Sequence, residues 1–166
     1  MKLNNKIKIF IIILLNIIIQ STILSRLKIF GVIPNLSIPI IVNLSLGFGA
    51  FVGGYNALII GLIEDAVFSS VIGVRALIYY LIKFLIGDSK IRINKEDYRT
   101  GVFLTAICTV INMVISYIIY LILGKNIELL TYLSGGVFIE ILENIILYLI
   151  LYRIFKKIFT FPDFRV

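Results

Sequence analysis

Apolar residues follow one another in long stretches that contain few charges. Four stretches come close to the ~20 residues that a helix needs to cross a bilayer: residues 7–24, 71–87, 102–123 and 133–152. A fifth stretch, residues 36–63, runs for 28 residues without a charge. As one helix it would be about 42 Å long at 1.5 Å per residue, which exceeds a comfortable single span.

The glycine-rich sequence GFGAFVGGYN at residues 47–56 offers a break inside this fifth stretch. A break gives two short helices, 36–51 and 53–68, and six spans in total, whereas an unbroken helix gives five. With six spans and a cytoplasmic N-terminus, 11 Lys and Arg residues lie inside and four outside, but five spans place five inside and 10 outside. The 11 residues are Lys2, Lys6, Lys8, Lys90, Arg92, Lys95, Arg99, Arg153, Lys156, Lys157 and Arg165. Because cytoplasmic loops carry the excess of positive charge, we predict an all-α membrane protein. It is a bundle of six transmembrane helices with both termini cytoplasmic, forming one domain over residues 1–166.

The composition agrees with a membrane protein. Hydrophobic residues make up 60% of the chain, charged residues 15%, and the mean hydropathy is +1.09, far above the values of soluble domains. We interpret the net charge of +7 as contact with anionic lipid headgroups, not with nucleic acid. The chain has no histidine and one cysteine, Cys108, inside an apolar stretch, so we expect no metal and no cofactor.

The motifs of common enzymes are missing from the sequence. The glycines at 47–54 lack the Lys-Ser/Thr of a P-loop, and no H-E-x-x-H or nucleophile–base set occurs. The adjacent carboxylates Glu64 and Asp65 would point about 100° apart on a helix, which is unsuitable for a cooperating acid–base pair. We therefore predict that the protein is not an enzyme.

Small residues recur every four positions in the third predicted span, at Gly53, Ala57, Gly61 and Asp65. This spacing places them along one helix face, and small residues let helices approach closely in membranes. We expect the face to pack inside the bundle.

Charged side chains also occur inside the spans. Arg75 and Lys83 share a face of the fourth predicted span with Tyr79, and the last span carries Glu140 and Glu143. A charge near mid-bilayer costs about 2.5–3.5 kcal/mol on insertion scales. We expect these groups to point inward and to pair, Lys83 with Glu143; if those two do not touch, Arg75 with Glu140 is the next pair to test. The residues leave two interpretations open, a polar core that fixes helix register and a proton relay or substrate cavity.

Three stretches resemble the MreD family of bacterial rod shape-determining proteins. They are Gln20-Ser-Thr, FGVIPNLSIPIIV at residues 30–42, and GLIEDAVFSSVIGVRALIYYLIKFLIG at residues 61–87. Asp65 matches the family's acidic position and Glu64 is an additional carboxylate. Pro34-Asn35 stands where the family usually has Pro-Asp, so one charge is lost at that turn.

The resemblance implies a non-enzymatic, multi-pass subunit of the complex that elongates the lateral cell wall, in the bacterial inner membrane. Such a subunit associates with the bitopic protein MreC and, through it, with the actin-like MreB and with the wall-synthesising glycosyltransferase and transpeptidase. The implied role of Asp65 is to fix the turn into the fourth span, together with Arg75. The candidate structural or interaction residues are Pro34, Asn35, Gly53, Gly61, Glu64, Asp65, Arg75, Lys83, Glu140 and Glu143.

The implied fold is similar to the substrate-binding components of energy-coupling-factor vitamin transporters, which supply the alternative function. Those components commonly dock through a pair of small residues on their first helix. The first span here, IFIIILLNIIIQS at residues 9–21, has no such pair, which favours the MreD interpretation. A proton-coupled exporter is a third class and rests only on the intramembrane carboxylates.

Overall fold

A computed structural model describes residues 4–27, 31–69, 71–87, 97–124 and 136–159. Its helices are α1 (Asn5–Ile19), a π-helical turn η1 (Gln20–Leu24), α2 (Ser37–Phe48), α3 (Ala50–Phe68), α4 (Val74–Gly87), α5 (Tyr98–Ile122) and α7 (Gly136–Ile158). The predicted all-α class is confirmed.

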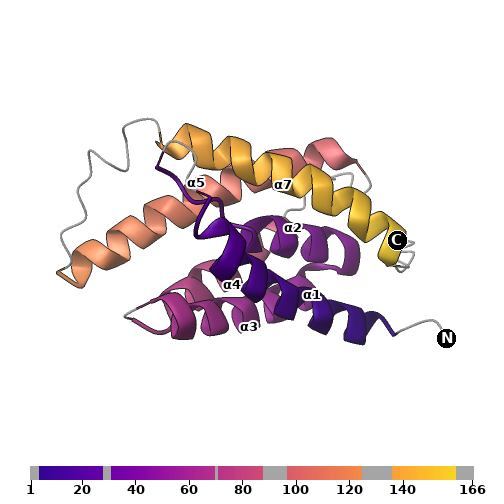
Figure 1. Cartoon of the computed structure of the whole chain (residues 1–166), viewed down its shortest axis with the longest axis horizontal. Coiled ribbons are helices and arrows are strands. Elements are labelled where there is room, and N and C mark those ends of the chain that lie inside the picture. The colour runs from indigo at the N-terminus through magenta and orange to yellow at the C-terminus, as the bar shows by residue number, and fades with distance from the viewer. Residues whose placement is uncertain (1–3, 28–30, 70, 88–96, 125–135, 160–166) are drawn as a thin grey trace.

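The shortest apolar helix occupies the centre of the bundle. Figure 1 shows α2 between the pair α5 and α7 on one side and the pair α3 and α4 on the other, with α1 crossing in front. Helix α2 packs against α3, α4, α5 and α7, and every residue from Ser37 to Leu46 is buried. A 12-residue helix suffices here, because neighbouring helices and not lipid surround it.

The stretch that carries no charge is divided at Gly49. This glycine has φ +90° and ψ 159° and separates α2 from α3. A positive φ is readily available only to glycine, so the chain turns back at this residue without strain. The observed helices end at Phe48 and begin at Ala50, compared with the predicted boundaries of 51 and 53.

The other boundaries differ from the predicted spans by a few residues. Helix α4 begins at Val74, not 71, after Gly73 with φ +103°. Helix α5 begins at Tyr98, not 102, because the Asp97 side chain accepts the Arg99 backbone N–H at 3.0 Å and caps the helix. Helix α7 continues to Ile158, six residues past the predicted end at 152. The predicted start of the last span at 133, most of the basic loop 88–100 and the tail from 160 lie outside the described residues.

Three described helices are long and apolar enough to cross a membrane: Asn5–Leu24, Ala50–Phe68 and Tyr98–Ile122. Large apolar side chains project outward from them, including Phe10 at 61% exposed, Phe51 at 83% and Phe103 at 66%. Such a surface would be unfavourable in water and is suited to lipid contact.

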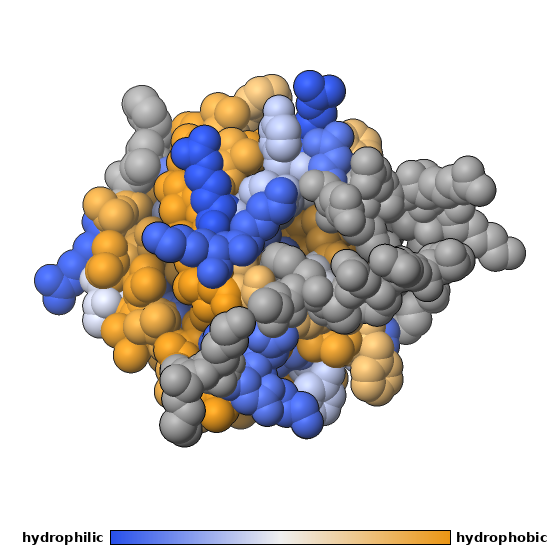
Figure 2. All heavy atoms as spheres, turned by 90° about the vertical axis from the view of Figure 1, so that its right-hand side faces the viewer, coloured by the Kyte–Doolittle hydropathy of each residue, from blue (hydrophilic) through white to orange (hydrophobic). Residues whose placement is uncertain are grey.

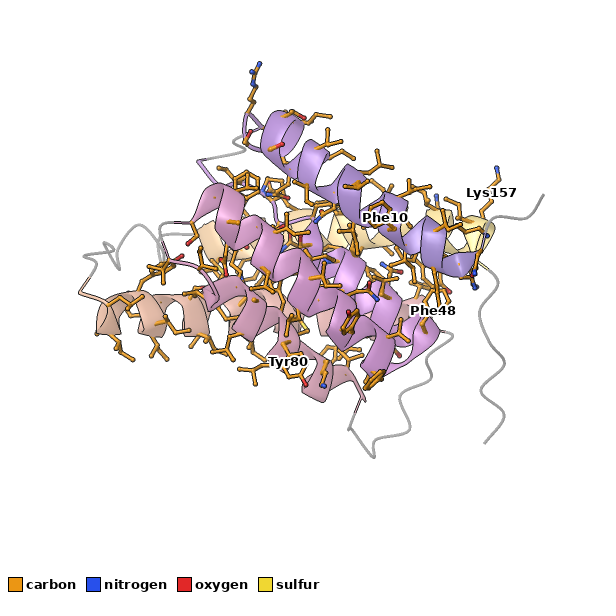
Figure 3. All side chains as sticks on the ribbon, turned by 90° about the horizontal axis from the view of Figure 1, so that it is seen from below. Phe10, Phe48, Tyr80 and Lys157 are labelled. Carbon is orange, nitrogen blue, oxygen red and sulfur yellow. The ribbon has the colours of Figure 1, made fainter. Side chains whose placement is uncertain are left out.

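One end of the bundle is basic. Lys8 Nζ donates a hydrogen bond to the Ile158 carbonyl at 2.7 Å, so the start of α1 lies beside the end of α7. Figure 2 views this end, where hydrophilic side chains gather over an apolar body. In Figure 3, Lys157 points away from the bundle at the same end. The described basic residues of this end are Lys6, Lys8, Arg99, Arg153, Lys156 and Lys157.

Candidate functional site

Glu64 is the centre of a polar network at the opposite end of the bundle. Its side chain, on α3, is almost fully buried at 2% exposed. Ser37 Oγ donates a hydrogen bond to Oε1, and the Tyr79 hydroxyl donates to Oε2 at 2.9 Å. Arg75 Nη1 lies 3.9 Å from Oε2. The carboxylate therefore has two hydroxyl donors and a nearby cation, as a buried charge requires.

Asn35 extends the network to α7. Its Nδ2 donates to the Tyr79 hydroxyl at 2.8 Å, and its Oδ1 accepts the Ser37 backbone N–H at 3.0 Å. The Asn35 backbone N–H donates to Asn144 Oδ1 at 2.9 Å, and Asn144 Nδ2 donates to Thr109 Oγ1 at 3.0 Å. The amide at position 35 thus both donates and accepts, which an ionised aspartate cannot do.

Helix α1 joins the network through two side chains. Asn16 Nδ2 donates to Ser37 Oγ at 2.7 Å. Gln20, the first residue of the π-helical turn, donates from Nε2 to the Pro34 carbonyl and accepts the Leu36 backbone N–H at Oε1, both at 3.0 Å. The segment before α2 is thereby fixed to α1 on both sides of Asn35.

Together these contacts join all six described α-helices, and we refer to the set as the polar network. Its members are Asn16, Gln20, Asn35, Ser37, Glu64, Arg75, Tyr79, Thr109 and Asn144. Intramembrane polar groups are stable only when they are satisfied by partners of this kind.

Asp65 faces a different part of the bundle from Glu64. Its Oδ2 accepts backbone N–H groups from Gly73 at 2.8 Å, Arg75 at 2.9 Å and Ala76 at 3.3 Å. These donors lie at the start of α4, where backbone N–H groups lack partners within the helix and the helix dipole favours an anion. Asp65 thus caps α4, while the Arg75 side chain, which we expected beside Asp65, lies near Glu64.

The small-residue face of α3 contacts two neighbouring helices. A Cβ added at Gly53 would lie 2.6 Å from Ser45 Cα on α2. A Cβ added at Gly61 would lie 2.5 Å from the Ala76 backbone nitrogen and 2.8 Å from the Arg75 carbonyl carbon on α4. Ala57, between these glycines, is fully buried. The face therefore packs within the bundle and brings Glu64 and Asp65 close to α4.

A cavity of about 310 Å³ opens beside the polar network. Residues from the described helices and the segments joining them line it: Gln20, Ser25, Ile33, Asn35, Glu64, Phe68, Arg75, Asn112, Ser116, Tyr120 and Glu140. Three candidates from the sequence, Glu64, Arg75 and Glu140, therefore meet at one cavity. Its volume is within the range of small-molecule sites.

The expected pairing of Lys83 with Glu143 is wrong. Lys83 Nζ instead donates to the Tyr80 hydroxyl at 2.7 Å and lies 3.9 Å from the centre of that ring; Tyr80 lies toward one edge of the bundle in Figure 3. Within the described part of the chain, neither carboxylate oxygen of Glu143 has a hydrogen-bond partner. Helix α4 packs mainly against α2, α3 and α5, and among the described residues no ion pair or hydrogen bond joins Lys83 to Glu143.

We expect the effects of Lys83→Met and Glu143→Gln on the free energy of unfolding to add within about 0.5 kcal/mol, because separated side chains do not couple. Thermal or denaturant unfolding of the two single variants and the double variant in detergent measures this. The matched control is Arg75→Met with Glu64→Gln, whose charged groups lie 3.9 Å apart and should be non-additive. Coupling between Lys83 and Glu143 as strong as in the control pair would contradict the observed geometry.

The sequence model of the rod shape-determining protein MreD matches residues 1–158. The chain belongs to the MreD family. The resemblance inferred from the sequence is thus confirmed, and this member of the MreD family is a membrane protein with a role in rod-shape determination. No curated protein and no solved structure matches the chain.

Sequence reasoning did not identify several members of the polar network. Ser37 and Thr109 give no distinct signal in apolar helices, because hydroxyl side chains are common there and often bond the preceding turn. Asn144 stands beside Glu143 in the sequence, yet Asn144 is the residue that enters the network. For Ser37 alone there is a local indication, because the spacing Asn35-x-Ser37, in which Asn35 Oδ1 accepts the Ser37 N–H, is a helix-start signal.

Proposed function

We propose that this MreD-family protein is a non-enzymatic membrane subunit of the cell-wall elongation complex. In this role it holds an MreC-like bitopic protein and, through that protein, an MreB-like filament and the wall-synthesising glycosyltransferase and transpeptidase. The family match over residues 1–158 carries the proposal. The polar network supports it, because side chains that satisfy one another make a rigid bundle on which partners can assemble.

We place the protein in the inner membrane as six spans with both termini in the cytoplasm. The structure describes six α-helices, and the start of α1 lies beside the end of α7. Two chain ends on the same side of the bundle support an even number of spans. The concentration of Lys and Arg at that end supports its cytoplasmic orientation.

Single cysteines test this orientation. In a Cys108→Ala background, a membrane-impermeant maleimide should label Ile72→Cys in intact spheroplasts, since Ile72 lies between α3 and α4 and is 71% exposed. Lys157→Cys, at the basic end, should be labelled only after the membrane is permeabilised. The opposite labelling pattern would invert the topology, and labelling of both positions in sealed spheroplasts would rule out a fixed orientation.

Partner association tests the scaffold role. The chain should co-purify with the bitopic protein when both are co-expressed, and its depletion in a rod-shaped host should give rounded cells. Photocrosslinking side chains introduced at Phe51, Phe103 and Phe138, exposed on α3, α5 and α7, should then identify the helix that the partner contacts. Failure to co-purify, together with unchanged cell shape on depletion, would refute the proposal.

A further inference from the structure

Two polar groups in the cavity are not used by the polar network. Glu140, on α7, forms no ion pair and no hydrogen bond with any other described residue. Asn112 Oδ1, on α5, is buried and has no hydrogen-bond partner among the described residues. A buried acceptor without a donor, such as Asn112 Oδ1, is rare in folded proteins and calls for a specific explanation.

The cavity lining also contains one carboxylate more than its described cations compensate. Arg75 lies 3.9 Å from Glu64 and 5.8 Å from the Phe68 ring centre, so its cation compensates the carboxylate of α3. The Glu140 carboxylate remains without a cation on the described lining. A ligand for this cavity therefore needs a positive charge and hydrogen-bond donors.

We propose that the cavity binds a primary ammonium group, carried by a small amine or by an amine-bearing lipid headgroup. A primary ammonium has one positive charge and three N–H donors. The donors match the Glu140 carboxylate, Asn112 Oδ1 and the Ser116 hydroxyl, all of which line the cavity. Asn112, Ser116 and Tyr120 recur every four residues on α5, so this wall presents one polar helix face.

The same chemistry disfavours two other cations. A quaternary ammonium carries the charge but has no N–H group for Asn112 Oδ1. Among the described residues, no group of three or more His, Cys, Asp or Glu side chains is placed to hold a metal ion.

The first test is thermal unfolding of the full chain in neutral detergent and an amine-free buffer. Cys108 is the single cysteine and is fully buried, so a fluorogenic thiol dye reports unfolding without an added label. Ethanolamine at about a hundredfold excess over its dissociation constant should raise the unfolding midpoint by roughly 9 °C. Choline at equal ionic strength should raise it little. An equal rise with both compounds, or none with ethanolamine and none with the lipid below, overturns the proposal.

Two variants one helical turn apart make the test specific. Glu140→Gln removes the charge that faces the cavity and should weaken binding at least tenfold. Glu143→Gln removes a carboxylate on the same helix that does not line the cavity and should change binding much less. Equal losses in both variants, or no loss in Glu140→Gln, would contradict the assignment of Glu140.

Nanodiscs distinguish the two sources of the amine. If a lipid supplies it, phosphatidylethanolamine should raise the unfolding midpoint above that in phosphatidylcholine, and Glu140→Gln should abolish the difference. If a small amine supplies it, only soluble ethanolamine should stabilise the protein, in either lipid. The outcome is independent of partner co-purification, so failure of the ammonium site leaves the scaffold role standing.

Discussion

Replacing Gly61 by leucine is expected to prevent α3 and α4 from packing. A Cβ at this position would lie 2.5 Å from the Ala76 nitrogen and 2.8 Å from the Arg75 carbonyl carbon, which is far below van der Waals contact. The atoms that a leucine would meet belong to the α4 backbone, which cannot rotate away as a side chain can. One of the two helices must therefore move. Overpacking of this kind costs on the order of 3 kcal/mol, or roughly 10 °C in the unfolding midpoint of a chain of this size. Folded yield in the membrane should fall with it.

The same helix offers a matched control. Ala66 lies five residues after Gly61, about 140° round the helix axis, and is exposed, so Ala66→Leu places a leucine side chain toward the exterior and should change the midpoint little. Gly61→Ala, which improves intrinsic helix propensity by about 1 kcal/mol, should still destabilise. Stabilisation by Gly61→Ala would show that α3 and α4 do not approach as closely as the structure has them.

The second large effect is expected at Asp65. Asp65→Ala removes the acceptor of three backbone N–H groups at the start of α4, from Gly73, Arg75 and Ala76. Asp65 is fully buried, so water cannot readily replace it, and a buried donor left unsatisfied costs about 1–3 kcal/mol. We expect a total loss of about 3 kcal/mol in the free energy of unfolding. Asp65→Asn keeps a side-chain oxygen and should lose about half as much.

Asp97 provides the comparison for this prediction. It caps α5 by the same type of hydrogen bond, to the Arg99 N–H at 3.0 Å, but in an exposed position. Asp97→Ala should therefore cost no more than about 1 kcal/mol. Denaturant or thermal unfolding in detergent measures both, and equal effects at the two caps would show that the burial of Asp65 does not determine its contribution.

The helices could be predicted from the sequence because lipid imposes a simple rule on apolar stretches. A long run with few charges must be helical in a membrane, and glycine supplies the positive φ that reverses the chain at Gly49. The ends of the helices were harder to predict from the sequence, because they depend on single side chains. Asp97 is an example, since its capping hydrogen bond extends α5 beyond its apolar stretch.

The partners of the charged residues could be predicted only in part. Arg75, Glu64 and Glu140 do line one cavity, yet the Arg75 side chain lies near Glu64 and not near Asp65. Adjacent carboxylates point in different directions, and the sequence does not tell which direction faces the neighbouring helix. The pairing of Lys83 with Glu143 rests on their depths alone. Depth along the bundle does not specify which helices are neighbours, and α4 packs against α2, α3 and α5.

Asn35 has a consequence for how this sequence can vary. Its amide donates to the Tyr79 hydroxyl, which in turn donates to Glu64. An aspartate at position 35 would remove the first donor and bring a second negative charge to a group of side chains that has Arg75 as its compensating cation. Positions 35 and 64 should therefore evolve as a unit. A lineage that acquires aspartate at the first position is expected to lose the charge at the second, and either change alone should be selected against until the other follows.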